Sequence, residues 1–378
     1  MNTHNDPVPF TRPFFDDEMV TRYVAEVASV LRSGRVTSGP YVAEFERKIE
    51  NTIRAKHVLA VNSGTAALHA AVKSLGLSPG DEILVPADTF VSTVNAILYE
   101  GLRPVFVDVD ASTFNLSPDS LQERITSRCK GVIAVHLGGN PCDMDSILDV
   151  AQSSGVPVVE DAAQALGAEF RGKPCGTIGL VGALSFDHAK VITAAEGGAI
   201  ATDDLRVAAT VRKFSNLGRS ELGYESVDTV GYNYRLSELH AALGIVSLSR
   251  LEASLSNRVA AGLRYRSLLS RVDWLTLQTL QPDSKMSFHA TIVKLARDSP
   301  VSRNELMQQL LARGIGSSIL FRPVNLQPVY QKLVGDTHGL CPNAEDLGEN
   351  SIALPMFNDI TSEQVDRVVE SIEQIARG

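Results

Sequence analysis

The sequence contains few cysteines, and they are scattered along the chain. Its four cysteines, at 129, 142, 175 and 341, form neither a CxxC pair nor the spacing of a metal-ligand set. This pattern excludes a disulfide-stapled scaffold or a zinc-finger type of fold as the basis of stability. We therefore expect reduced thiols, as in a cytoplasmic protein, and no bound metal.

Long apolar runs are also missing. No stretch has the length needed to cross a bilayer, and residues 1–9 are polar, without the apolar core of a signal peptide. Internal repeats and low-complexity segments are absent as well. These absences predict a globular cytoplasmic protein that does not act in a membrane.

Positive charge is in deficit, because 35 lysines and arginines face 44 acidic residues and give a formal net charge of −9. The basic residues are spread out rather than clustered, so neither nucleic acid nor an anionic membrane is the expected partner. The chain also lacks GxGxxG and Walker motifs, so nucleoside triphosphate chemistry is not indicated.

What the chain does contain is a regular alternation of short apolar runs and amphipathic segments. Its 378 residues suffice for two domains, which we place at residues 1–250 and 251–378. In the first, predicted strands alternate with predicted helices; the strands are residues 57–61, 83–85, 104–107, 131–135, 158–160, 181–186 and 198–202. Such alternation predicts an α/β fold with a mainly parallel sheet covered by helices on both faces.

The flanking segments complete this pattern. Asp16 and Asp17 are the predicted caps of a helix that runs to about residue 33, and Asp203 is the predicted cap of a helix that ends at 214. The apolar face of the first helix consists of Val20, Tyr23, Val24, Val27 and Leu31. One long helix is predicted at 238–269. The tail predicts a smaller α/β domain, with strands at 288–295 and 317–321 and capping boxes opening helices at Ser302 and Thr361.

Ligands of parallel sheets bind at the carboxyl ends of the strands. Gly64, Phe90, His136 and Asp161 all fall at such ends, and Lys190 follows the strand at 181–186. An amine and a carboxylate so placed suit pyridoxal phosphate (PLP): the amine forms a Schiff base with the cofactor aldehyde, and the carboxylate keeps the pyridine nitrogen protonated. Lys190 and Asp161 are therefore the candidate catalytic residues.

Residues 62–67 join a strand to the N-terminus of a helix through small residues. Free backbone N–H groups and the helix dipole make such a junction an anion site, and Ser63 and Thr65 add hydroxyl donors. A simple helix cap is the alternative interpretation of the same residues. Phe90, on a loop after a strand, could stack on a flat ring or could be an ordinary core residue.

These motifs together resemble the DegT/DnrJ/EryC1/StrS family of sugar aminotransferases, which are PLP enzymes of fold type I. The resemblance spans nearly the whole chain and rests on motifs in the family's order: SGRVTSGP, NSGTAALHAA, PADTFVSTVNAI, VHLGGNPCDMD, VEDAAQALGAE, SFDHAK with EGGAI, and VGYNYRLSELHAALG. It implies a large, mostly parallel seven-stranded sheet domain with helices on both faces and a smaller C-terminal α/β domain.

The resemblance also implies residue roles. Lys190 would carry the cofactor, Asp161 would pair with its ring nitrogen, and Gln164 would approach the ring hydroxyl, with Phe90 stacked on the ring. The implied phosphate contacts are Ser63, Gly64, Thr65, Ser185 and, reaching from the other subunit of a homodimer, Asn233. The loops after residues 34, 215 and 322 would select the substrate, with Thr37, His188, Arg219 and Asn325 as candidate contacts.

The implied activity is transfer of an amino group, from L-glutamate, to a nucleotide-linked 3- or 4-keto-6-deoxyhexose in sugar, glycan or antibiotic biosynthesis. Departures from the family pattern at Gly138, His188, Ala195, Leu217 and Asn325 leave a cyclitol ketone or another non-nucleotide acceptor open. A PLP-dependent sugar dehydratase, which has histidine at the lysine position, is a further alternative that Lys190 disfavours. A non-catalytic PLP-binding regulator is the alternative from a different class.

Overall fold

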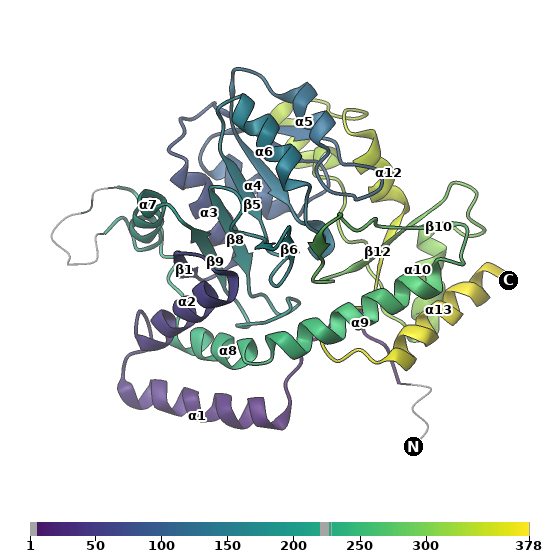
Figure 1. The fold of residues 1–378 in the computed structure, drawn as a ribbon, viewed down its shortest axis with the longest axis horizontal. Coiled ribbons are helices and arrows are strands. Elements are labelled where there is room, and N and C mark those ends of the chain that lie inside the picture. The colour runs from purple at the N-terminus through teal and green to yellow at the C-terminus, as the bar shows by residue number, and fades with distance from the viewer. Residues whose placement is uncertain (1–5, 220–226, 228, 378) are drawn as a thin grey trace.

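The computed structural model describes residues 6–219, 227 and 229–377. The chain builds a large α/β unit and a smaller unit that contains the C-terminus, joined along the helices α8 and α9 (Figure 1). Residues between 45 and 245 form the buried apolar cores of the large unit, which Val324, Tyr330, Cys341 and Ala344 of the smaller unit join, and Val8 with residues from 261 to 375 forms the core of the smaller unit.

Seven strands among the described residues form the main sheet, in the order β1-β9-β8-β5-β4-β2-β3. Their bounds are β1 His57–Val61, β2 Glu82–Pro86, β3 Arg103–Val107, β4 Cys129–Val135, β5 Val158–Asp161, β8 Val181–Ser185 and β9 Gly198–Thr202. Strands β3, β2, β4, β5 and β8 are parallel neighbours, whereas β9 runs antiparallel to both β8 and β1. The predicted mostly parallel sheet is confirmed.

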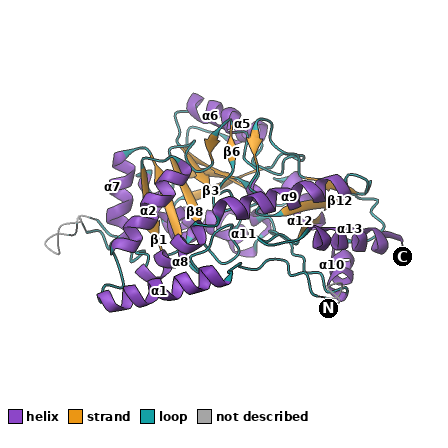
Figure 2. Cartoon of the chain, turned by 60° about the horizontal axis from the view of Figure 1, so that its bottom comes forward, coloured by secondary structure: helices purple, strands orange, loops and turns teal. Residues whose placement is uncertain are grey.

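Helices cover both faces of this sheet (Figure 2). The alternation of buried residues explains why: Ile83 and Val85 pack in the core beneath α3, α4 and α7, and Leu84 between them packs on the opposite side, in the core of α5 and α6. The helices of this unit are α1 Asp17–Ser33, α2 Pro40–Ile53, α3 Gly64–Ser74, α4 Val91–Tyr99, α5 Pro118–Arg124, α6 Met144–Ser153, α7 Leu205–Ser215 and α8 Glu238–Leu248.

The smaller unit packs helices on a three-stranded antiparallel sheet in the order β10-β12-β13. Its elements are α9 Leu251–Leu269, β10 Leu275–Leu277, β12 Thr291–Leu295, α10 Arg303–Ala312, α11 Pro328–Val334, α12 Pro342–Asn350, β13 Ser351–Leu354 and α13 Ser362–Arg377. The short strands β6 Glu169–Phe170, β7 Lys173–Pro174 and β11 Ser284–Lys285 pair across the two units. Val8, near the start of the chain, bridges to Ile315 and belongs to this second core.

Several predicted elements differ in the structure. The single helix predicted at 238–269 is wrong: α8 ends at Leu248 and α9 begins at Leu251. Residues 317–321 do not form a strand, because only Ser318 bridges to Ala353; the strand predicted from 288 begins at Thr291. The cap of α7 is Asp204 rather than Asp203, and its carboxylate accepts hydrogen bonds from two backbone N–H groups. The capping boxes at Ser302 and Thr361 are confirmed.

Helix α1 presents part of its predicted apolar face to solvent, whereas Tyr23 and Val27 of that face are partly buried. Met19 and Val30, on its other side, are buried, while Val20, Val24 and Leu31 are 51%, 62% and 59% exposed. The helix lies on the outer side of α8 in Figure 1. A row of exposed valine and leucine side chains on a surface helix is typical of a covered surface in an assembly.

Within the part of the chain that the structure describes, none of the helices combines the length and the apolar character that a membrane crossing requires.

Candidate active site

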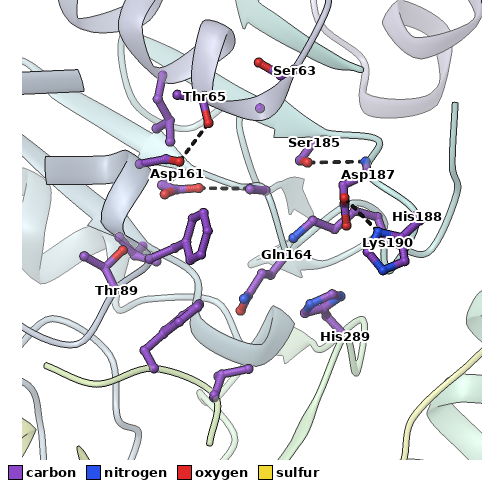
Figure 3. Close-up of a pocket in the computed structure, with 18 of the residues that line it drawn as sticks. Ser63, Thr65, Thr89, Asp161, Gln164, Ser185, Asp187, His188, Lys190 and His289 are labelled. Carbon is purple, nitrogen blue, oxygen red and sulfur yellow. Dashed lines mark hydrogen bonds and ion pairs between the residues drawn. The ribbon is translucent and has the colours of Figure 1, made fainter. Parts of the chain in front are cut away.

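A cavity of about 410 Å³ opens at the carboxyl ends of the central strands. It brings together most of the residues that the sequence singled out, and Figure 3 shows them facing one space. The predicted residues that line it are Ser63, Gly64, Thr65, Phe90, Asp161, Gln164, Ser185, His188 and Lys190. The predicted catalytic pair comes from neighbouring parallel strands, with Asp161 ending β5 and Lys190 in the loop after β8.

Asp161 is 5% exposed and held by two donors. The Thr93 hydroxyl donates to its Oδ2 at 2.8 Å, and the Ala163 backbone N–H donates to its Oδ1 at 3.1 Å. Burial raises the pKa of Asp161, although these hydrogen bonds and the charge of Lys190 oppose the rise. A cationic ring nitrogen against this carboxylate would offset the cost of burying its charge.

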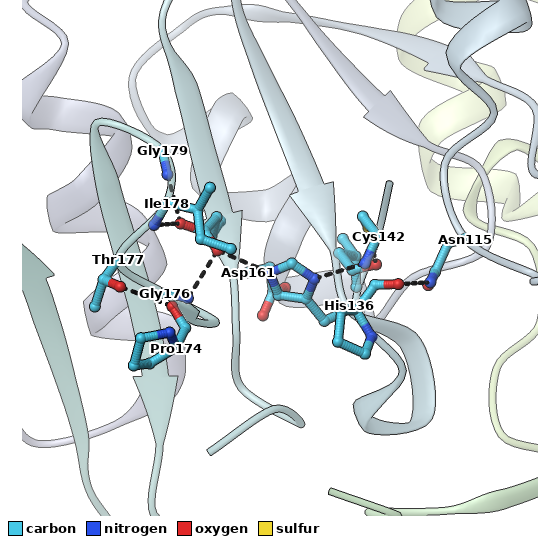
Figure 4. Close-up of polar contacts among 12 residues, drawn as sticks. Asn115, His136, Cys142, Asp161, Pro174, Gly176, Thr177, Ile178 and Gly179 are labelled. Carbon is cyan, nitrogen blue, oxygen red and sulfur yellow. Dashed lines mark hydrogen bonds and ion pairs between the residues drawn. The ribbon is translucent and has the colours of Figure 1, made fainter. Parts of the chain in front are cut away.

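The neighbouring Glu160 hydrogen-bonds the end of β5 to the loop that precedes β8. Its buried carboxylate accepts backbone N–H groups from Gly176, Ile178 and Gly179 at 2.6–2.7 Å (Figure 4). His136 Nε2 donates to the same carboxylate at 2.9 Å, because its Nδ1 already accepts the backbone N–H of Cys142. His136 follows β4 at the carboxyl end of the strand, as predicted, but it is fully buried and does not line the cavity.

Lys190 extends from a turn in which its backbone N–H donates to the Asp187 carbonyl at 3.1 Å. Burial lowers the pKa of the Lys190 amine; the charges of Asp187 and Asp161 oppose this and the charge of Arg258 adds to it. An amine with a lowered pKa is more readily available as a nucleophile at neutral pH. His188, two residues earlier, is exposed and pairs with Asp187 at 2.9 Å.

The third corner of the cavity is the N-terminus of α3. The Ser63 hydroxyl caps the helix by accepting the Ala66 N–H at 3.1 Å, and the Thr65 hydroxyl lies 2.7 Å from that of Ser92. A Cβ on Gly64 would lie 2.8 Å from the Cβ of Ser185, so only glycine fits there. This close approach of backbone and hydroxyl groups at a helix N-terminus suits a phosphate group.

Gln164 and Phe90 lie between these corners. The side-chain Oε1 of Gln164 accepts the Gly138 N–H at 2.7 Å, which leaves the side-chain NH₂ as its donor. Phe90 is 54% exposed at the start of α4, and its ring centroid lies 5.8 Å from that of Phe321. An aromatic side chain exposed on the wall of a polar cavity is suited to cover a flat ring.

Four predicted site residues do not line this cavity: Thr37, Arg219, Asn233 and Asn325. Thr37 bridges to Ser237, and Asn233 is exposed and bridges to Asn216. Asn325 is fully buried, and its amide donates to Glu345 at 2.8 Å and to the Thr337 carbonyl at 3.2 Å. The folded chain thus gives Asn325 a structural position rather than the predicted contact with substrate.

His289 lines the cavity and was not identified from the sequence. It lies near Gln164 in Figure 3, although it comes from the segment that precedes β12 in the smaller unit. Burial lowers the pKa of His289 well below its ordinary range, and the charges of Lys190 and Arg258 reinforce the effect, so the imidazole is neutral. No local sequence pattern marks His289 as a site residue, because contacts between the two units cannot be derived from consecutive residues.

The residues of the cavity fit PLP. An amine for its aldehyde, a buried carboxylate for its ring nitrogen, an aromatic side chain for its ring face and a glycine-lined helix N-terminus for its phosphate all border one space. When bound, PLP supplies an electron sink that makes a carbanion next to its imine nitrogen accessible.

Comparison with known proteins supports the same cofactor. The chain is 35% identical to the Bacillus subtilis spore coat polysaccharide biosynthesis protein SpsC, with 99% of this chain and 98% of SpsC covered. S. venezuelae DesV, solved with a ketimine intermediate, is 33% identical with a TM-score of 0.92 and 99% of both chains covered. Streptococcus pneumoniae Spr1654, solved in its PLP form, is 29% identical with a TM-score of 0.91, and 98% of this chain and 99% of that chain are covered.

The family model of the DegT/DnrJ/EryC1/StrS aminotransferases matches residues 17–373, which is nearly the whole chain. With the fold-type-I architecture and the PLP site described above, the chain therefore belongs to this family and is a PLP-dependent aminotransferase.

Proposed function

We propose that this aminotransferase moves an amino group from L-glutamate to a keto-sugar, specifically a nucleotide-linked 3- or 4-keto-6-deoxyhexose. The observation that carries the proposal is that Lys190 and Asp161 border one cavity at the carboxyl ends of adjacent strands. The name of SpsC, which concerns polysaccharide biosynthesis, supports a sugar as the acceptor. A cytoplasmic location stays a prediction from the sequence.

The proposed roles follow from the geometry. Lys190 carries the cofactor and, once released, moves a proton between the α-carbon of the donor and the cofactor. Asp161 holds the ring nitrogen in its protonated state, which Thr93 supports through its 2.8 Å hydrogen bond. Ser63, Gly64, Thr65 and Ser185 hold the phosphate, Gln164 approaches the ring hydroxyl, and Phe90 covers the ring. Thr37, His188 and Arg219 remain proposed contacts of the acceptor.

Replacement of Lys190 tests the cofactor link. Lys190→Ala is expected to lose the visible absorbance of the bound cofactor, while the matched control His188→Ala, two residues earlier and exposed, keeps it. Persistence of that absorbance in Lys190→Ala would refute the assignment.

The amino donor and acceptor are tested in two half-reactions. Wild-type protein mixed with L-glutamate is expected to release 2-oxoglutarate and lose the visible absorbance, and a nucleotide-linked keto-sugar is expected to restore it. Restoration only by cyclitol ketones would replace the sugar acceptor with the alternative acceptor. Failure of every amino acid to change the absorbance would favour a non-catalytic regulator.

We propose further that a second copy of the chain completes the site. The exposed apolar face of α1 needs a cover, and Asn233 is exposed outside the cavity of its own chain. Val24→Glu is expected to shift the sedimentation coefficient toward a monomer, whereas Leu311→Glu, 70% exposed on α10, leaves it unchanged.

Mixing two inactive variants tests whether the copies share the site. If Asn233 acts across the interface, a heterodimer of Lys190→Ala and Asn233→Ala chains contains one intact site. Refolded mixtures would then recover part of the wild-type activity. A mixture that stays as inactive as its parents would show that each site uses residues of a single chain.

A further inference from the structure

A fully buried arginine of the smaller unit contacts His289, which lines the cavity. Arg258, on α9, is 1% exposed. Its Nε donates to Asn358 Oδ1 at 2.6 Å, and its Nη1 donates to the carbonyls of Phe288 and His289 at 3.3 and 3.2 Å. All three acceptors are uncharged.

A buried guanidinium without a carboxylate partner is costly. Burial lowers the pKa of Arg258 to about 10, and no carboxylate among the described residues offsets that effect. An apolar side chain of similar length would fill the same space at lower cost. The retained charge therefore points to a role beyond packing.

One side of Arg258 leads to the catalytic lysine. Asn358, which accepts its Nε–H, donates its own side-chain amide to the carbonyl of Val191 at 2.9 Å. Val191 directly follows Lys190 in the chain. Asn257, next to Arg258 on α9, holds Asn358 in place by donating to its backbone carbonyl at 2.8 Å. The arginine thus holds the Lys190 loop through a single intermediate residue.

The other side of Arg258 leads to His289. The segment around it is hydrogen-bonded to the loop at Gly138 and Gly139: Ser287 N–H donates to the Gly139 carbonyl at 3.1 Å, and Ala290 N–H donates to the Gly138 carbonyl at 3.2 Å. Between them Phe288 has a φ of 48°, a conformation that a residue with a side chain adopts only when its surroundings impose it. Arg258 binds the two carbonyls at this turn.

We propose that Arg258 is a positioning residue for the transamination reaction. It fixes the Lys190 loop and the His289 segment relative to each other through its hydrogen bonds, and its positive charge acts on the Lys190 amine. The inference rests on the proposed role of Lys190. The charge favours the neutral amine of Lys190 over the ammonium, and the neutral amine is the form that reacts with a carbonyl carbon.

Titration of Lys190 separates this role from a merely structural one. In the apoprotein, the pH dependence of Lys190 acetylation by acetic anhydride, followed by peptide mass spectrometry, gives the midpoint for the amine. Arg258→Met is expected to move that midpoint to higher pH, because a like charge has been removed. The visible absorbance of the holoenzyme is expected to titrate with a shift in the same direction.

Two further variants complete the test. Arg266→Met is the control on the same helix. Arg266 is a partly buried arginine that donates to the carbonyl of Gln278 at 2.6 Å, and its replacement is expected to leave the Lys190 midpoint unchanged. Arg258→Lys keeps the charge but cannot reproduce the three hydrogen bonds, so its midpoint stays near wild type while kcat falls by about tenfold or more.

The outcomes are separable. A folded Arg258→Met protein with a wild-type midpoint overturns the inference. If that variant does not fold, Arg258→Lys decides: a lowered kcat supports positioning, and a wild-type kcat overturns it. A wild-type holoenzyme without cofactor absorbance tied to Lys190 would contradict the proposed function instead, and the acetylation midpoints of the apoprotein would still test the effect of Arg258.

Discussion

Asp88 is a buried carboxyl group whose ionisation should oppose folding at neutral pH. It is 5% exposed and directly precedes Thr89 and Phe90, which line the cavity. Burial raises its pKa from 3.8 to about 7. Because the folded-state pKa lies above the unfolded one, the neutral acid costs nothing below about pH 4, and the penalty grows until the pH passes about 7.

The magnitude follows from that difference in pKa. Three units at about 1.36 kcal/mol each give a full penalty of about 4 kcal/mol above pH 7. Between about pH 5 and about pH 8 the penalty rises by about 2.5 kcal/mol. Asp88→Asn, which has the same shape and no charge, should therefore gain stability over wild type, and the gain should be larger at pH 8 by that amount.

Urea unfolding of both proteins at the two pH values measures the effect. Asp110→Asn is the matched control. Burial alone would raise the pKa of Asp110, but hydrogen bonds from Ser112 and Thr113 outweigh burial, so the pKa is lowered. That variant should lose stability equally at both pH values, because Asp110 is ionised throughout this range. A difference between Asp88→Asn and wild type that is the same at pH 5 and pH 8 would refute the reasoning.

Three further outcomes are expected. Gly64→Ala forces a Cβ to within 2.8 Å of Ser185, so PLP affinity measured by equilibrium dialysis should fall at least about tenfold; unchanged affinity would contradict the tight phosphate corner. Ala195 has a φ of 63°, a conformation that favours glycine, so Ala195→Gly should raise the free energy of unfolding by about 0.5–1 kcal/mol in urea titrations. Destabilisation by this change would show that the backbone at residue 195 is not strained. Thr93→Val removes a hydrogen bond that lowers the pKa of Asp161, so it should move the acidic limb of the kcat profile to higher pH; an unmoved limb would show that this hydrogen bond does not tune the acid.

The local pattern of the sequence was sufficient for the elements that build the site. Short apolar runs predicted β1 and β9 with their observed bounds, and small residues after β1 predicted the helix N-terminus at Gly64. Asp161 and Lys190 were singled out because one lies at the end of a strand and the other in the loop after a strand, and the carboxyl ends of parallel strands meet at one edge. Short-range periodicity and strand ends are written in consecutive residues, so one chain is enough to read them.

Contacts between distant segments could be decided only by the tertiary structure. His136 also follows a strand, yet its ring is hydrogen-bonded to Glu160 and to the Cys142 N–H and is fully buried, so it does not line the cavity. Asn325 lies in a loop that was predicted to contact the substrate, but it is fully buried and its amide donates a hydrogen bond to Glu345. His289 reaches the cavity because Arg258 and the loop at 138–139 fix its segment. Each of these positions depends on a partner far along the chain, and no local pattern encodes that pairing.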